Sequence, residues 1–302
     1  MKYREMLNQI FISVVLAVMV ISIGCTSKSS SPTDPGSVSD EDAIRNLINS
    51  EYMTLLSEAT HYSQPDTAGK SACFAPILPI HWYRHPLDGF QKDIIIQING
   101  DTAYITVSFT GMGDFKIFYF KQNHIDSVIK NFVDDFTREA MFVRVQDANS
   151  AYNGWRLRGI KPGKIATPGG NHYIDSLIIQ TSDTTYHVDN FDIYYNIHDD
   201  SLNGLMTLNQ GENISITMYT HGDSVDAFVH ISWKDYHRRS YLMPDTLNPG
   251  VYSRDDIILD SNMPDHVHLA FDIIDFNTLH DDSAAYYSAA YIIPFNVSYP
   301  DY

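Results

Sequence analysis

The feature that most constrains the fold is an alternation of apolar and polar residues that runs through almost all of residues 170–302. A period of two is the pattern of half-buried strands, because successive side chains of a strand point to opposite faces. Turn residues separate the alternating segments, and no helical pattern lies between them. The eight predicted strands cover residues 176–180, 185–197, 213–219, 225–233, 239–243, 256–260, 266–274 and 287–297.

Short strands at this spacing are typical of a β-sandwich, and the segment resembles immunoglobulin-like and fibronectin-type domains. We therefore expect residues 170–302 to form a separate immunoglobulin-like domain. The disulfide of antibody domains is excluded, because the only cysteines are Cys25 and Cys73 and both precede this segment. Tyr286 and Tyr287, near the last strand, are candidates for a contact like the tyrosine corner.

The preceding residues, 40–165, combine a helix with antiparallel strands. Ser39 or Asp40 can cap a helix that runs to about residue 58, where apolar residues recur at steps of three and four. Asn99-Gly100-Asp101 supplies the turn of a hairpin. Further elements predicted here are an irregular segment at 61–90, strands at 102–109 and 115–120 around a turn at 111–114, a short helix over 125–136, and strands at 141–145 and 152–160.

This order of elements resembles the nuclear-transport-factor-2-like (NTF2-like, or SnoaL-like) fold, an α+β cone made of a curved antiparallel sheet and helices. The resemblance rests on the opening helix, on residues 99–107, and on Gly154-Trp155-Arg156-Leu157 with Ile160. It covers residues 40–162 and implies an NTF2-like domain over 40–165. Proline and glycine at 162–163 and 167–170 predict a linker to the immunoglobulin-like domain.

The resemblance also implies a pocket inside the cone. Tyr52 lies on the apolar stripe of the helix, roughly where ketosteroid isomerase carries an oxyanion-donating tyrosine, although core packing is the alternative role. His81, Trp82 and His85 form the densest cluster of functional side chains and are predicted in an aromatic loop near the mouth. We therefore take Tyr52, His81, Trp82 and His85 as candidate ligand-binding residues.

Three functional hypotheses remain open, of which the third is a purely structural component of the cell envelope. The first is a binding or interaction protein without catalysis, because no spacing identifies a nucleophile, a phosphate loop or a catalytic base. The second is an NTF2-like enzyme acting on a small apolar or carbonyl compound, with Tyr52 as donor and a histidine or aspartate as base. No catalytic residue is assigned, and no cofactor is expected.

One segment has the beginning of a calcium-loop pattern. Asp199, Ser201 and Asn203 carry oxygens at positions one, three and five, and Gly204 stands at position six. Position twelve is Gln210 where an EF-hand requires glutamate, and the flanking residues predict strands. A hairpin turn is therefore the preferred interpretation, with calcium as the weaker one.

The N-terminus predicts export. Lys2 and Arg4 precede an uncharged run over residues 10–23, the layout of a signal peptide. Fourteen residues make about 21 Å of helix, whereas a bilayer core is roughly 30 Å thick, so a stable transmembrane helix is disfavoured.

The end of this run, Ile21-Ser22-Ile23-Gly24-Cys25, resembles the lipobox of bacterial lipoproteins, with serine in place of the usual leucine. The resemblance implies cleavage after residue 24 and acylation of Cys25. The alternative is an ordinary signal peptide followed by a chance cysteine. Because Thr26 is not the aspartate that retains many such proteins in the inner membrane, an outer-membrane location in the cell envelope is favoured.

Composition limits the partners. Residues 1–24 hold two cationic residues and one anionic residue, so cleavage changes the net charge from −17 to −18. This acidity disfavours nucleic acid as a partner. We expect residues 25–39 to consist of the acylated cysteine and a flexible tether, because they are rich in serine and proline. We expect Cys73 to be a buried, inert thiol. The expected partners are the bilayer, through Cys25, and an envelope protein or a small molecule.

Overall fold

The structure, a computed structural model, describes residues 38–56, 79–87, 92–121, 124–147, 149–197, 204–233, 236–260 and 263–298. Ser39–Tyr302 form one compact unit, in which sixteen strands are joined edge to edge. The named strands pair antiparallel except for β10 and β16, which run parallel. None of the described helices has the length and apolar composition needed to span a bilayer.

The predicted helix at the start of this unit is present but shorter than expected, since the α-helix ends at Leu47 and a π-helical turn ends at Tyr52, whereas the predicted end was near residue 58. The hydroxyl of Ser39 accepts a hydrogen bond from the backbone N–H of Asp42, and acidic residues occupy the first turn, where the helix dipole favours them. The first part of the chain contains α2 (Asp40–Leu47), the π-helical turn η1 (Ile48–Tyr52), β1 (Pro79–Pro86), β2 (Asp93–Asn99), β3 (Thr102–Lys121), β4 (His124–Arg144), the 3₁₀ turn η2 (Ala151–Gly154) and β5 (Trp155–Ile160).

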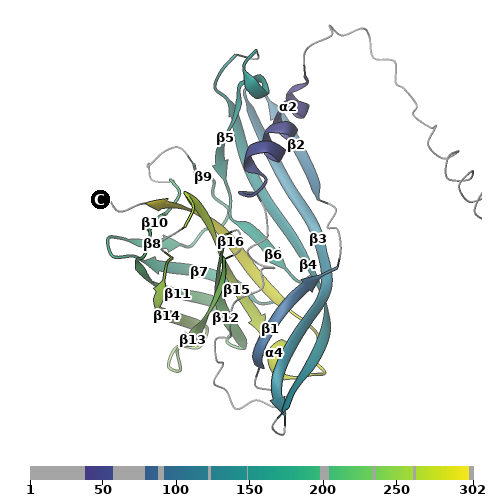
Figure 1. Ribbon diagram of the computed structural model, residues 1–302, viewed down its shortest axis with the longest axis vertical. Helices are drawn as coiled ribbons and strands as arrows, with labels where there is room; N and C mark the ends of the chain where they lie inside the picture. Colours follow the sequence, from purple (N-terminus) through teal and green to yellow (C-terminus); the bar gives the residue numbers. More distant parts are fainter. Residues whose placement is uncertain are drawn as a thin grey trace, which may run out of the picture. The chain divides into compact units, whose positions relative to one another are not determined.

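Strands β3 and β4 form a ribbon that runs along one side of the unit (Figure 1) and pairs over its full length. The predicted hairpin of β2 and β3 is confirmed, but the predicted helix over 125–136 is wrong. Alternate residues of β4 are buried, and these include Lys130, Asp134 and Arg138. Three of the inward-facing residues of β4 are charged, so its apolar residues alone do not alternate with a period of two. This is why the strand was not recognised from the sequence.

The predicted turn at 111–114 and the predicted irregular segment at 61–90 are also wrong where the structure describes them. A Cβ atom on Gly113 would lie 2.2 Å from the carbonyl oxygen of His85. Glycine here lets β1 approach β3 closely, so the residue marks a strand contact and not a turn. Pro79 and Pro86 are the end residues of β1, positions where a strand tolerates proline.

The second part of the chain forms strands close to those predicted from the alternation. Only the segment 185–197 is interrupted, since β8 and β9 are separate strands. The elements are β6 (Gly163–Ala166), β7 (Tyr173–Gln180), β8 (Thr185–Val188), β9 (Tyr195–Asn196), β10 (Thr207–Asn209), β11 (Asn213–His221), β12 (Val225–Trp233), β13 (Tyr236–Pro244), β14 (Val251–Ile258), β15 (His266–Asp275), α4 (Phe276–His280) and β16 (Ser288–Ser298).

The expected NTF2-like cone with a separate immunoglobulin-like sandwich is not what the chain forms. Strand β6 lies inside the predicted linker, yet it pairs with β4 on one side and with β16 on the other. The sheet is therefore continuous from the first part of the chain into the second. Its main path is β1-β3-β4-β6-β16-β15-β12-β13-β14-β11-β7-β8, with β2, β5, β9 and β10 attached beside it.

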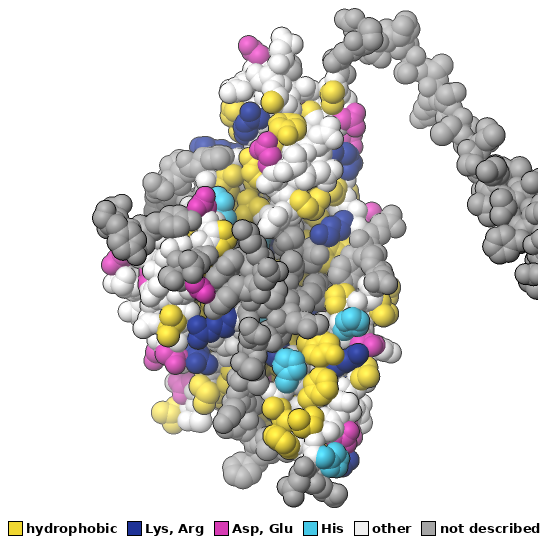
Figure 2. All heavy atoms as spheres, in the orientation of Figure 1, with side chains coloured by type: hydrophobic (Ala, Val, Ile, Leu, Met, Phe, Trp, Pro, Cys, Tyr) yellow, Lys and Arg dark blue, Asp and Glu magenta, His cyan; other side chains and the backbone are white. Residues whose placement is uncertain are grey.

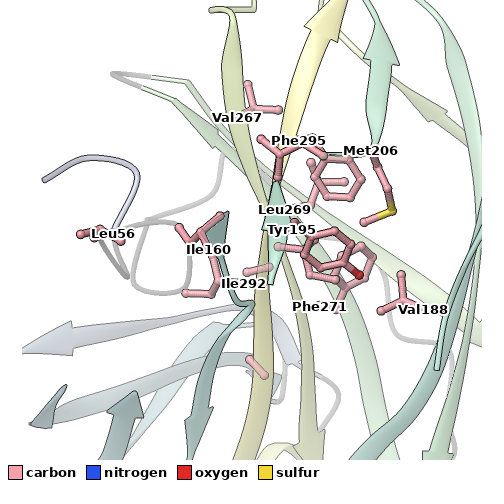
Figure 3. Close-up of a cluster of buried hydrophobic side chains, with 14 of the residues drawn as sticks. Leu56, Ile160, Val188, Tyr195, Met206, Val267, Leu269, Phe271, Ile292 and Phe295 are labelled. Carbon is pink, nitrogen blue, oxygen red and sulfur yellow. The ribbon is translucent and has the colours of Figure 1, made fainter. Parts of the chain in front are cut away.

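The hydrophobic core crosses the same boundary. Figure 3 shows Leu56 and Ile160, from the first part, in one cluster with Phe271, Ile292 and Phe295 of β15 and β16. All five side chains are buried. Neither part of the chain therefore encloses a core of its own, which is the requirement for two independent domains.

Candidate functional site

The structure separates the residues that the sequence suggested as a ligand site. Trp82 points inward from β1 and is buried, whereas His81 and His85 lie on the opposite face of the same strand. His81 contacts the rings of Tyr83 and Phe118 at centroid distances of 5.8 and 6.0 Å. Burial, and then the charge of Arg239, lower the pKa of His81.

Tyr52 lies near the other end of the ribbon. Its ring packs edge-on against Phe142 at 5.8 Å. Phe142 pairs with Ala103 on β3, while His81 pairs with Phe118 on the same strand. Fifteen residues at about 3.3 Å each put roughly 50 Å of strand between these pairs. Tyr52 and His81 therefore do not share a site, and the enzyme hypothesis loses the cone on which it depended.

The weak calcium candidate Asp199, Ser201 and Asn203, the cysteines Cys25 and Cys73, and the signal and tether lie outside the described residues. Within the described ranges, no group of three or more histidine, cysteine, aspartate or glutamate residues is arranged to hold a metal ion.

A buried ionic network between β1 and β15 was not predicted from the sequence. Arg84 of β1 forms a two-pronged ion pair with Asp272 of β15, with N···O distances of 2.9 and 3.2 Å. Both side chains are almost completely buried. Burial disfavours the charged guanidinium, but Asp272 and then Tyr286 and Asp134 outweigh this and raise the pKa of Arg84.

Tyr286 extends the network to β4. Arg84 Nε donates to the Tyr286 hydroxyl at 2.6 Å, and that hydroxyl donates to Asp134 Oδ2 at 3.0 Å. Ser288 is 2.6 Å from the same hydroxyl, and Thr167 donates to the other oxygen of Asp134 at 2.9 Å. The network thus connects β1, β4, β15 and the start of β16.

His230 of β12 completes it. Its Nε2 lies 3.1 Å from Asp272 Oδ2. Burial lowers the pKa of His230 to about 4, because the hydrogen bond to Asp272, which acts in the opposite direction, does not compensate for it. The charges of Arg239 and Arg84 lower the pKa further. The imidazole is therefore neutral at pH 7 and donates from Nε2.

This network is enclosed by the protein. Arg84, Asp134, His230 and Asp272 are each at most 2% exposed, so no substrate has access to the His230–Asp272 pair. The arrangement satisfies buried charges with one another and with hydroxyl groups, which stabilises one packing of the strands. We assign it a structural role.

The concave site lies elsewhere, between β4, β6, β16 and the segment after β8, and has a volume of about 370 Å³. Its lining includes three cationic and three anionic residues, one asparagine, one threonine and two aromatic residues, of which one is a tyrosine. The lining residues are Thr137, Arg138, Glu139, Lys161, Pro162, Lys164, Asp189, Asn190, Phe191, Asp192 and Tyr291.

Lys161 holds one side of this pocket in place. Its Nζ lies 2.6 Å from Asp192 and 2.9 Å from Glu139. Partial burial opposes the charge, but the hydrogen bonds to these two carboxylates prevail and raise the pKa of Lys161. Tyr194 donates to Glu139 at 3.0 Å, and burial followed by this hydrogen bond raises its pKa to about 12. Lys161 is therefore charged and Tyr194 neutral near pH 7, so neither is a proton-transfer group there.

Two aromatic rings also line the pocket. Phe191 and Tyr291 stack with centroids 3.8 Å apart and an interplanar angle of 3°. Both are half-buried, and burial raises the pKa of Tyr291. The pocket therefore combines a flat apolar surface with donors and acceptors, which is the usual composition of a ligand site.

Sequence reasoning did not find this pocket, because its residues come from four segments that are distant in the chain. Lys161 adjoins the predicted linker, and Tyr291 lies in a predicted strand. Only the pairing of β6 with both β4 and β16 brings them together. Comparison with protein-family models, with curated proteins and with solved structures found no match for this chain.

The buried imidazole predicts a pH dependence of stability. In the unfolded chain His230 takes up a proton near its ordinary pKa of about 6.5, whereas in the folded chain it does so only near 4. Unfolding is therefore favoured as pH falls through this window, with a slope of up to about 1.4 kcal/mol per pH unit from this one residue. Urea denaturation of residues 26–302 at several pH values between 7 and 4 measures it.

The matched variants are His230→Gln, which keeps a donor for Asp272 but does not titrate, and His187→Gln at an exposed histidine. We expect the first to flatten the slope between pH 6.5 and about 4, and the second to leave it unchanged. If His230→Gln does not alter the slope, this imidazole takes up its proton at the same pH in the folded and in the unfolded chain, which contradicts the prediction.

Proposed function

We propose that this chain is a lipid-anchored protein of the bacterial cell envelope that binds, without chemical conversion, a small uncharged polyhydroxylated ligand such as a sugar. The single observation that supports the ligand class is the lining of the pocket at Lys161. Arg138, Lys161 and Lys164 stand among Glu139, Asp189 and Asp192 in that lining.

The balance of charges decides against an ionic ligand. A strongly anionic or cationic molecule meets like charges in this pocket as well as opposite ones, and the guanidinium of Arg138 is already bonded to two backbone carbonyl groups, so the net attraction of either kind of ion is small. A hydroxyl group both donates and accepts, so it can bind to lysine, carboxylate and amide side chains alike. An uncharged ligand with several hydroxyl groups uses every polar wall of the pocket.

The aromatic wall supports the same class. The C–H faces of a sugar ring are apolar and pack well on flat aromatic surfaces such as Phe191 and Tyr291. The ion pairs of Lys161 fix two of the polar groups before a ligand arrives, which lowers the entropy cost of binding. Two of the three carboxylates in the lining, Glu139 and Asp192, are already paired with Lys161, which favours binding over catalysis.

The anchor is supported by the sequence. The lipobox-like Ile21–Cys25 segment is followed by a Ser- and Pro-rich stretch, and the compact unit begins only at Ser39. About fourteen residues of this composition would allow a reach on the order of 20 Å from a membrane surface. The pocket would then operate close to the membrane to which Cys25 is attached.

Calorimetric titration tests the ligand class. Residues 26–302 are titrated with the neutral disaccharides cellobiose and N,N′-diacetylchitobiose, with citrate as an anion and with spermidine as a cation. We expect at least one disaccharide to bind with a dissociation constant below about 1 mM, and both ions to bind at least tenfold more weakly. Tight binding of citrate or spermidine would contradict the proposed ligand class. A failure of both disaccharides to bind would contradict it as well.

Two variants locate the binding. Phe191→Ala removes one ring from the pocket wall and should weaken disaccharide binding at least tenfold. Tyr287→Ala removes an exposed aromatic ring that does not line the pocket and should leave binding unchanged. Equal affinities in the two variants would place the sugar elsewhere on the molecule.

Labelling with palmitate tests the anchor separately. Cells that express the full chain are fed labelled palmitate, and the protein is recovered from the membrane fraction. We expect the wild-type protein to be labelled and the Cys25→Ser variant to be unlabelled and to retain its signal segment. Label on the variant, or none on the wild type, would refute lipid attachment at this cysteine.

A further inference from the structure

A second surface on this molecule has no role in the proposed ligand binding. The outward side chains of β1 and of the adjoining halves of β3 and β4 are largely apolar, and we call this surface the ribbon face. Phe120, Ile125 and Ile129 are 66%, 61% and 57% exposed. Figure 2 shows hydrophobic side chains and histidines gathered over the lower part of the unit, where Figure 1 places β1 and these halves of β3 and β4.

The strand register makes this surface continuous. Phe120 pairs with Ile125, and Met112, nine residues before the end of β3, pairs with Val133. Paired residues on neighbouring strands point to the same face. The apolar surface therefore extends along the ribbon and is not a set of isolated exposed residues, and surfaces of this kind mark contact sites.

The aromatic side chains of β1 widen it. His81 and Tyr83 both lie 6.0 Å from Phe118 by ring centroid, and Tyr83 stacks on Phe118 at 26°. All three are only partly buried. The sequence had suggested His81 as a ligand residue, and the structure places it on a flat sheet surface, which suits another protein surface better than a small molecule.

Two opposite charges stand at the centre of the ribbon face. Asp114 and Lys116 are two residues apart on β3, so both point outward, and neither forms an ion pair with the described part of the chain. Consider two copies whose ribbon faces are in contact, related by a two-fold axis that lies in the interface, perpendicular to β3 and level with Phe115. This axis places Lys116 of one copy opposite Asp114 of the other. The same axis places Phe118 opposite Met112. The centre of the ribbon face is thus complementary to itself, as an isologous dimer requires, while Phe120 and Ile125, nearer the hairpin end, lie opposite Thr110 and Asp135 of the other copy.

We propose that the ribbon face is a homodimer interface, covered in solution by the same face of a second copy and held in register by reciprocal Lys116–Asp114 pairs. Each molecule carries a net charge of about −18 without its signal segment, so two copies repel one another over most of their surfaces. At the centre of the ribbon face the charges of Asp114 and Lys116 cancel, and the residues around them are mostly apolar. The centre of the ribbon face therefore adds no net charge to the repulsion between two copies.

Charge exchange tests the dimer. Sedimentation equilibrium of residues 26–302 should show a monomer–dimer equilibrium. Lys116→Asp places four carboxylates at the centre of the interface and should weaken the dimer at least tenfold. Adding Asp114→Lys to the same chain reverses both charges, restores the reciprocal pairs and should return the dissociation constant to within about threefold of the wild type, a difference of about 0.7 kcal/mol.

Ile258→Ser, at an exposed residue of β14 that lies outside the ribbon face, is the matched control and should not change association. Circular dichroism and melting temperatures establish that each variant is folded. A wild-type protein that remains monomeric at about 100 μM, where an equilibrium of moderate affinity would be populated, overturns the proposal. A dimer that Lys116→Asp leaves intact, or that the double variant does not restore, also overturns it.

Discussion

The buried ion pair between Arg84 and Asp272 is the interaction on which the arrangement of the strands most depends. It joins the first strand of the sheet to β15, across 188 residues of chain. An isolated charge in this interior would be very costly, but here each charge has a partner of opposite sign and further hydrogen bonds. The pair stabilises the structure only when β1 and β15 are placed correctly, so it specifies the packing of the two parts of the chain against one another.

The same rule accounts for the inward face of β4. Lys130 donates to the backbone carbonyl groups of Asn277 and Asp281 around α4, and Asp134 accepts from Tyr286 and Thr167. Arg138 donates to the carbonyl oxygens of Leu55 and Ile292. Each of these charged side chains contacts an element that lies far away in sequence. The polar interior therefore connects the strands that the hydrophobic core brings together.

The sequence predicted local structure well where the pattern was apolar against polar. The helix after Ser39, the hairpin at Asn99-Gly100-Asp101 and the strands of the second part of the chain were recognised in this way. Prediction failed on β1 and β4, because Arg84, Lys130 and their neighbours replace apolar residues on the buried face. A charged residue in the core is informative only together with its partner, and the partner is not visible in one sequence.

The division into domains failed for a related reason. Proline and glycine around residues 162–170 have the composition of a linker, but the four residues of β6 between them bridge two strands. Gly163 is there because a Cβ atom would lie 2.7 Å from the guanidinium of Arg138. The pocket at Lys161 depends on this bridge, so neither its existence nor its residues could be inferred before the pairing of β6 was known. Of the four residues first suggested as a site, only His81 and His85 share a surface.

The central claim is that the whole of Ser39–Tyr302 folds as one unit held by the buried network. Differential scanning calorimetry of residues 26–302 and of Arg84→Met tests it most directly. The account predicts one transition with equal calorimetric and van't Hoff enthalpies, shifted as a whole to lower temperature in the variant, because Asp272 is left without its partner at a cost of about 3–5 kcal/mol. Two separate transitions, of which the variant lowers only one, would show that the two parts of the chain fold independently and would contradict the account.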